Sequence, residues 1–162
     1  MIFSAELMAL AEDLLAHARA KGLKIATAES CTGGLLAGLL TEIPGSSDVF
    51  ERGFVTYSNA AKCDQLGVPD DVIREFGSVS ELVAREMAHG ALLHSKAQLS
   101  VAVTGIAGPS GGVAGKPVGL VHLAAARGDH LIHRQCSFGD IGRTEVRLKS
   151  VEAAIDLLGK LL

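Results

Sequence analysis

The sequence of 162 residues contains no tryptophan, one tyrosine and three cysteines, none of which forms a Cys-x-x-Cys pair. An odd number of dispersed cysteines argues against a disulfide framework and against a cysteine-ligated metal site. Lysine and arginine form no basic cluster, and no aromatic residues alternate with them. The sequence therefore lacks the usual features of a nucleic-acid-binding surface, and we expect reduced thiols and no nucleic-acid partner.

No apolar run reaches the roughly 20 residues that a membrane-spanning helix needs. The N-terminus also lacks the basic segment that opens a signal peptide. These features predict a cytoplasmic protein with no membrane partner. The six histidines form no metal-binding motif, since His89 and His94 do not share a face of the expected helix, and His130 and His133 point to opposite faces of the expected strand. We expect neither a metal nor another cofactor.

Apolar residues, in contrast, make up 48% of the chain, and 19 residues are glycine. A chain of this length suffices for one domain with a well-filled core, so we expect a single domain over residues 1–162. Helical and strand-like segments alternate up to the segments 118–127 and 130–137, which predict a β-hairpin. This order predicts an α/β fold: a three-layer α/β/α sandwich with a mixed, mostly parallel sheet.

A glycine-rich loop, 105–116, precedes the expected hairpin. It is not a phosphate-binding Walker A loop, because Ser110 stands at the place of the first glycine and Pro117 at that of the magnesium-binding hydroxyl. Both an amide-lined anion site and a plain surface loop remain open for it. The sequence predicts helices over 4–21, 35–40, 60–66, 70–76, 80–94 and 143–162. Besides the two hairpin strands, it predicts strands over 23–26, 49–57 and 99–104.

The stretch 27–34 places Ser30 where an expected strand turns into an expected helix. A hydroxyl beside converging backbone amides suits acyl transfer, which needs a nucleophile and a site for the oxyanion. Serine is also a favoured N-cap, so both roles of Ser30 remain open on this stretch alone. The adjacent Cys31 is a rival nucleophile, because a thiol at a helix N-terminus has a lowered pKa. The amides expected to be free in the first helical turn are those of Cys31, Thr32, Gly33 and Gly34.

A nucleophilic serine needs a base, and no histidine directly follows the carboxyl end of an expected strand. Lys62 lies just past such an end, next to small apolar residues. A lysine acts as a base when burial keeps it neutral, whereas a solvated helix lysine is the plainer alternative. Tyr57 suits either a proton relay or an aromatic position at the edge of the core. Sites in open α/β sheets lie at the carboxyl ends of strands, where Ser30, Tyr57 and Thr104 all fall.

Six ordered segments together extend over nearly the whole chain: Thr27–Gly34, Pro44–Ser47, Gly53–Lys62, Val79–Ser80, Val103–Pro109 with Gly111–Gly112, and Lys116–Gly119. They resemble the C-terminal domain of the competence/damage-inducible CinA family. The resemblance implies a three-layer α/β/α fold and, for free-standing domains of this kind, hydrolysis of the carboxamide of nicotinamide mononucleotide in pyridine nucleotide salvage. It also implies a Ser/Lys mechanism without a metal.

Carried over by motif, the resemblance implies that Ser30 is the nucleophile, Lys62 its general base and Tyr57 a helper in the proton path. It also implies that Arg143 meets the substrate phosphate, although the segment 140–143 is longer than the Gly-Asp-Arg spacing typical of the family. The residues expected to bind substrate are Cys31, Thr32, Gly33, Gly34, Asn59, Thr104, Gly105 and Arg143.

The leading interpretation is an amidohydrolase that acts on a linear amide and takes a small nucleotide as its substrate. The main alternative is a non-catalytic nucleotide-binding or sensing module that uses the same pocket. A thiol hydrolase that depends on Cys31 is a third interpretation. The sequence leaves the oligomeric state open, with a homo-oligomer among the outcomes.

Overall fold

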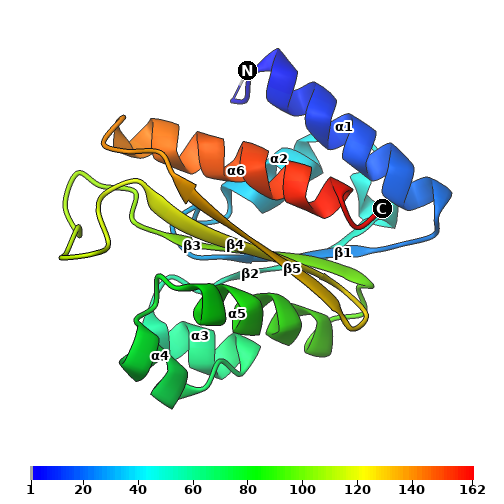
Figure 1. Ribbon diagram of the computed structural model, residues 1–162. Coiled ribbons are helices and arrows are strands. Elements are labelled where there is room, and N and C mark those ends of the chain that lie inside the picture. Colours follow the sequence, from blue (N-terminus) through cyan, green and yellow to red (C-terminus); the bar gives the residue numbers. More distant parts are fainter. Residues whose placement is uncertain (1) are drawn as a thin grey trace.

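The computed structural model describes residues 2–162, and its central element is a five-stranded sheet in the order β2-β1-β3-β4-β5 (Figure 1). β1 (Ile25–Glu29) pairs in parallel with both β2 (Phe50–Val55) and β3 (Leu99–Gly105). The hairpin strands β4 (Leu120–Arg127) and β5 (His130–Ser137) pair antiparallel to their neighbours. Only β4 therefore runs against the other strands, and the expected mixed, mostly parallel sheet is confirmed.

Helices cover both faces of this sheet, which confirms the three-layer α/β/α arrangement (Figure 1). Each helix predicted from the sequence is present, with ends that shift by a few residues. Ser4, Ser58 and Ser80 cap three of them, because each side chain accepts a backbone N–H from the first turn. One face carries α1 (Ala5–Ala20), α2 (Leu35–Glu42) and α6 (Arg143–Gly159), the other α3 (Asn59–Leu66), α4 (Asp70–Phe76) and α5 (Glu81–Leu93), and a short 3₁₀ helix, η1 (Ser46–Asp48), precedes β2.

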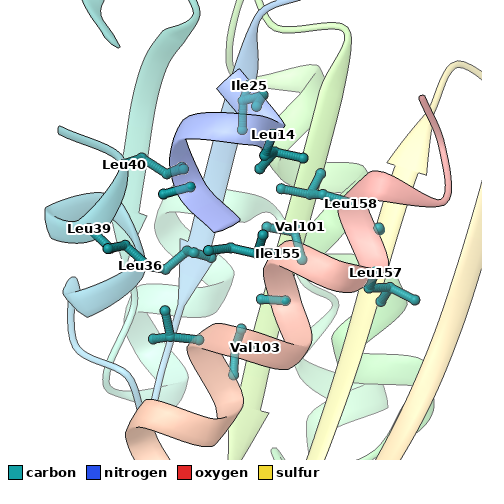
Figure 2. Close-up of a cluster of buried hydrophobic side chains, with 14 of the residues drawn as sticks. Leu14, Ile25, Leu36, Leu39, Leu40, Val101, Val103, Ile155, Leu157 and Leu158 are labelled. Carbon is teal, nitrogen blue, oxygen red and sulfur yellow. The ribbon is translucent and has the colours of Figure 1, made fainter. Parts of the chain in front are cut away.

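The larger of the two apolar cores lies under α1, α2 and α6. Leu14, Leu36 and Ile155, one from each helix, belong to a single buried cluster with Val101 and Val103 of β3 (Figure 2). Every second residue of β3 faces this cluster, as the two-residue period of a strand requires. The cluster anchors α2 and α6 to the sheet, and both helices begin at the carboxyl end of β1.

The second core is rich in alanine, and it includes Leu66 at the end of α3. Alanines of the sheet, among them Ala28, Ala102 and Ala124, pack under α5 around Met87. A Cβ atom built on Gly90 of α5 would lie 2.0 Å from the carbonyl oxygen of Leu66, the last residue of α3. Only glycine allows the two helix backbones to approach this closely, and the contact holds α3, which carries Lys62, against α5.

The first strand extends farther than the sequence predicts. We expected it over 23–26, but it spans Ile25–Glu29, and its last residue is a fully buried glutamate paired with Val55 of β2 and Val103 of β3. A carboxylate is a poor signal for a central strand, because its burial needs hydrogen-bond partners that only the folded chain provides. Ser30 consequently follows the strand directly.

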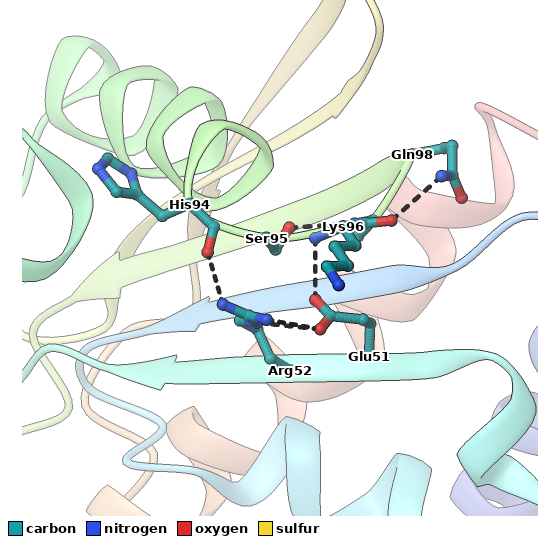
Figure 3. A network of polar contacts seen from close by, with 7 residues as sticks. Glu51, Arg52, His94, Ser95, Lys96 and Gln98 are labelled. Carbon is teal, nitrogen blue, oxygen red and sulfur yellow. Dashed lines mark hydrogen bonds and ion pairs between the residues drawn. The ribbon is translucent and has the colours of Figure 1, made fainter.

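A polar network ties the edge strand β2 to the chain between α5 and β3 (Figure 3). Arg52 donates to the carbonyl oxygen of His94 at 2.9 Å and to the Glu51 carboxylate at 2.8 Å. The same carboxylate accepts the backbone N–H of Lys96 at 3.1 Å. These contacts lie at the amino ends of the parallel strands, away from Ser30. None of the helices within residues 2–162 has both the length and the apolar composition that crossing a bilayer requires.

Candidate active site

Ser30 and Lys62 meet in the interior at the carboxyl end of β1. The Lys62 Nζ and Ser30 Oγ atoms are hydrogen-bonded at 3.0 Å, and Nζ also donates to the carbonyl oxygen of Thr56 at 3.0 Å. Lys62 is 1% exposed and Ser30 8%. The solvated-lysine interpretation of Lys62 is therefore wrong, and a hydroxyl and an amine from distant parts of the chain form a direct pair.

Burial lowers the pKa of the Lys62 amine below its ordinary value, because an ammonium group loses its hydration in the interior. The neighbouring Cys31 and Cys63 thiols act in the opposite direction, but their effect is smaller. The hydrogen-bond partners of Lys62 are a hydroxyl and a carbonyl rather than a carboxylate, so they do not hold the charge as an ion pair would. These surroundings thus shift the equilibrium of Lys62 toward the neutral amine, the form of lysine that accepts a proton.

The turn that follows Ser30 differs from the helix start that we expected. Helix α2 begins at Leu35, its N-cap is Gly34, and both Gly33 and Gly34 adopt positive φ angles, of 58° and 100°. The N-cap interpretation of Ser30 is therefore wrong: the serine stands four residues before the cap. Two consecutive left-handed residues fold the chain into a tight turn, a conformation that glycine adopts without strain.

The buried Glu29 carboxylate takes over the capping of α2. It accepts the backbone N–H groups of Gly34 at 3.2 Å, Leu36 at 2.9 Å and Ala37 at 3.0 Å. An acidic group at this end also matches the positive end of the helix dipole. We assigned Glu29 no role from the sequence, because the N–H groups that its carboxylate accepts lie five to eight residues further along the chain.

Two of the four amides expected to be free are in fact occupied. The Gly33 N–H donates to the Ser30 carbonyl oxygen at 3.0 Å, and the Gly34 N–H donates to Glu29. Among the described residues, the backbone N–H groups of Cys31 and Thr32 donate no hydrogen bond. These two amides directly follow the serine, so they are the candidates for binding an oxyanion.

Cys31 is a less suitable nucleophile than its position suggests. Burial raises the pKa of the Cys31 thiol to about 11, and this outweighs the opposing effects of the local backbone and Arg147. The expected lowering of this pKa is therefore wrong, because desolvation dominates. The thiol remains protonated near neutral pH.

Tyr57 and Arg143 lie together at the rim of the site. The Arg143 guanidinium donates to the Tyr57 hydroxyl oxygen and to the Gly108 carbonyl oxygen, both at 2.8 Å. Tyr57 is 61% exposed, so the core interpretation of its ring is wrong. Its hydroxyl oxygen accepts from Arg143, and among the described residues neither Ser30 nor Lys62 is hydrogen-bonded to it.

A cleft of about 230 Å³ connects the buried pair to this rim. The loop after β3, the loop before α5 and the start of α6 line this cleft. Figure 1 shows these three segments at one end of the sheet. The Thr104 hydroxyl fixes the loop before α5 by donating to the Ser78 carbonyl oxygen at 2.7 Å. Of the predicted site residues, the cleft is lined by Ser30, Cys31, Tyr57, Lys62, Thr104, Gly105 and Arg143, whereas Thr32, Gly33, Gly34 and Asn59 lie outside its lining.

The glycine-rich loop, for which the sequence left both a binding role and a plain surface position open, lines part of the cleft. Gly108, Ser110 and Gly111 belong to the lining, as does Ser78 from the loop before α5, a residue we did not predict. No histidine lines the cleft. Within residues 2–162 no three side chains of histidine, cysteine, aspartate or glutamate come together as metal ligands would.

Comparison with known proteins gives relatives of two lengths. The chain is 47% identical over 155 residues to the nicotinamide-nucleotide amidohydrolase PncC of Escherichia coli K12, covering 94% of this chain and 93% of that protein. It is also 47% identical over 141 residues to a putative competence-damage inducible protein of Caldicellulosiruptor saccharolyticus, covering 86% of this chain and 34% of that protein. The alignment thus takes in about a third of the longer relative.

Solved structures share the whole fold. The competence/damage inducible protein CihA of Agrobacterium tumefaciens superposes with a TM-score of 0.96 at 53% identity, covering 98% of this chain and 97% of that one. A CinA superfamily protein of Escherichia coli superposes with a TM-score of 0.92 at 33% identity, covering 99% and 94%. The family model described as the CinA C-terminal domain matches residues 7–162. The chain belongs to the CinA C-terminal domain family.

Proposed function

We propose that this chain is an amidohydrolase that converts nicotinamide mononucleotide to nicotinate mononucleotide and ammonia, as a step of pyridine nucleotide salvage. The observation that carries the proposal is the buried hydrogen bond of 3.0 Å between Ser30 and Lys62 in the lining of a cleft. The name of the Escherichia coli relative, which aligns over nearly its whole length, supports the choice of substrate and of bond.

In the first step, neutral Lys62 accepts the proton of the Ser30 hydroxyl while the oxygen attacks the carboxamide carbon. The backbone N–H groups of Cys31 and Thr32 hold the negative oxygen of the tetrahedral intermediate. The carbon–nitrogen bond then breaks, and the nitrogen leaves as ammonia with the proton that Lys62 received. A water molecule repeats these steps on the acyl-serine, which releases nicotinate mononucleotide and restores the free hydroxyl.

The rim residues receive the part of the substrate that does not react. Arg143 uses one hydrogen bond to each of Tyr57 and Gly108, and a guanidinium has five N–H donors, so donors remain for a phosphate. Thr104 and Gly105 border the space next to the buried pair. Apart from the Thr32 amide, which holds the oxyanion, we assign direct contact with substrate to lining residues, so Asn59 has no such contact in this proposal.

The decisive experiment measures product formation by the purified protein. With nicotinamide mononucleotide we expect release of ammonia and an equal amount of nicotinate mononucleotide, detected by chromatography. Nicotinamide riboside, which carries the same amide without the phosphate, is the matched control for recognition at the rim, and we expect it to react more slowly. If the nucleotide raises the melting temperature and no product forms, the chain is a sensing module and the amidase proposal fails.

The lowered pKa of Lys62 implies a specific dependence of kcat/KM on pH. The neutral amine is the reactive form, so kcat/KM should rise with pH through the Lys62 pKa and level off above it. The midpoint of this rise should lie below pH 10.5, the ordinary pKa of lysine, because burial lowers the pKa of Lys62. Measuring kcat/KM across pH tests this, with Cys63→Ser as a control for the neighbouring thiol. A flat profile over the whole range in which the protein stays folded would contradict the lysine base.

A further inference from the structure

The segment that carries the nucleophile is held from two sides, and neither of the two side chains that hold it belongs to the cleft lining. We call residues 30–34 the nucleophile turn. On one side, the Glu29 carboxylate accepts the N–H of Gly34 and two N–H groups of α2, and it also accepts the Thr27 hydroxyl at 3.4 Å. Glu29 is fully buried, so these bonds form without competition from solvent.

On the other side, Arg147 reaches the turn from α6. Its Nε donates to the carbonyl oxygen of Cys31 at 3.0 Å, and its Nη2 donates to that of Thr32 at 3.1 Å. A Cβ atom built on Gly33 would lie 3.3 Å from the same Nη2, so glycine there leaves room for the guanidinium. Arg147 follows Arg143 by one helical turn, and α6 therefore contributes both to the rim and to the support of the turn.

These bonds fix the two free amides through the planarity of the peptide unit. The Cys31 carbonyl and the Thr32 N–H belong to one peptide unit and point in opposite directions. Holding the carbonyl on Arg147 thus directs the Thr32 N–H away from Arg147. The Ser30 carbonyl, which accepts from Gly33, fixes the Cys31 N–H in the same manner. The turn has no other backbone N–H that is free among the described residues.

We propose that Glu29 and Arg147 are positioning residues that hold the nucleophile turn so that the Cys31 and Thr32 amides bind the oxyanion. The proposal rests on the amidase function proposed above and assigns roles to two residues that the mechanism does not use directly. Both act through the turn rather than on the substrate. Their removal should therefore affect the chemical step and leave the affinity for substrate nearly unchanged.

The test compares Glu29→Gln and Arg147→Met with wild type. Glutamine has the shape of glutamate but offers an NH₂ group where the carboxylate accepts N–H bonds, and methionine removes both donors of Arg147. We expect each variant to lower kcat by about 10²-fold, the usual cost of a misplaced or lost oxyanion donor, with KM within about twofold of wild type. Arg147→Lys, which keeps a charged donor, should recover part of the loss.

Arg127→Met is the matched control. Arg127 is also partly buried and donates to a backbone carbonyl, that of Leu161 at 2.7 Å, but beyond the opposite end of α6. We expect it to lower the melting temperature as Arg147→Met does and to leave kcat unchanged. The double variant of Glu29→Gln and Arg147→Met should lose less activity than the product of the single losses, because both act on one turn.

The outcomes separate the two proposals. If wild type releases no ammonia from nicotinamide mononucleotide, the proposed function fails and the positioning roles fail with it. If wild type is active and folded Arg147→Met keeps its kcat, only the positioning proposal is overturned. If Arg147→Met does not fold, Arg147→Lys is the deciding variant, because it replaces the two donors of the guanidinium with a single amine. A kcat of Arg147→Lys equal to that of wild type would then overturn the positioning proposal.

Discussion

Replacing Lys62 with methionine is expected to lower kcat for amide hydrolysis by about 10³-fold, within the range found for the loss of a general base. Methionine keeps the apolar part of the side chain and removes the amine that is 3.0 Å from Ser30 Oγ. The melting temperature should stay the same or rise, because a buried amine without a carboxylate partner costs free energy on folding. Initial rates of ammonia release and a thermal melt give both quantities.

Two further variants make this prediction specific. Lys62→Arg keeps a positive charge but cannot become neutral, so it should be as inactive as Lys62→Met if the lysine acts as a base. Lys24→Met is the matched control, since Lys24 also donates to a backbone carbonyl, that of Asp48 at 3.2 Å, but at the far end of the sheet. An active Lys62→Arg protein would show that the site needs a charge rather than a base.

The sequence was a sufficient guide to the fold because the local signals agree with one another. Ser4, Ser58 and Ser80 stand at helix starts, and Gly128 with Asp129 joins the two hairpin strands. The prediction of the first strand was wrong at its carboxyl end, where the local signal disagrees with the structure. The Glu29 carboxylate can be buried in a strand because the N–H groups of Gly34, Leu36 and Ala37 satisfy it, and no pattern within the strand indicates these partners.

The site was predictable only in part, for a related reason. Motif similarity identifies Ser30 and Lys62, but the distance between them depends on how α3 packs against α5, which is a tertiary contact. The pKa of Cys31 was predicted with the wrong sign, because position at a helix start is visible in a sequence and burial is not. The contact of Arg147 with the nucleophile turn joins segments more than a hundred residues apart and has no local signal.

Replacing Ser30 with alanine is expected to have the largest effect, a loss of kcat of about 10⁴-fold or more, as when the nucleophile of a hydrolase is removed. Binding should survive, because alanine removes one hydroxyl from a lining in which Tyr57, Arg143 and Thr104 are unchanged. Nicotinamide mononucleotide should therefore still raise the melting temperature of the variant. This pairing of lost turnover with retained binding separates a catalytic serine from one that only shapes the cleft.

Ser100→Ala is the control for the loss of a buried serine. Ser100 is fully buried on β3 and donates to the Ala88 carbonyl oxygen at 2.6 Å, outside the cleft. It should lower the melting temperature and keep kcat, because its hydrogen bond serves packing between α5 and the sheet. The mechanism is wrong if Ser30→Ala retains turnover. If Ser30→Ala retains turnover and Cys31→Ser loses turnover in the same assay, the Cys31 thiol is the nucleophile, despite a pKa that burial raises to about 11.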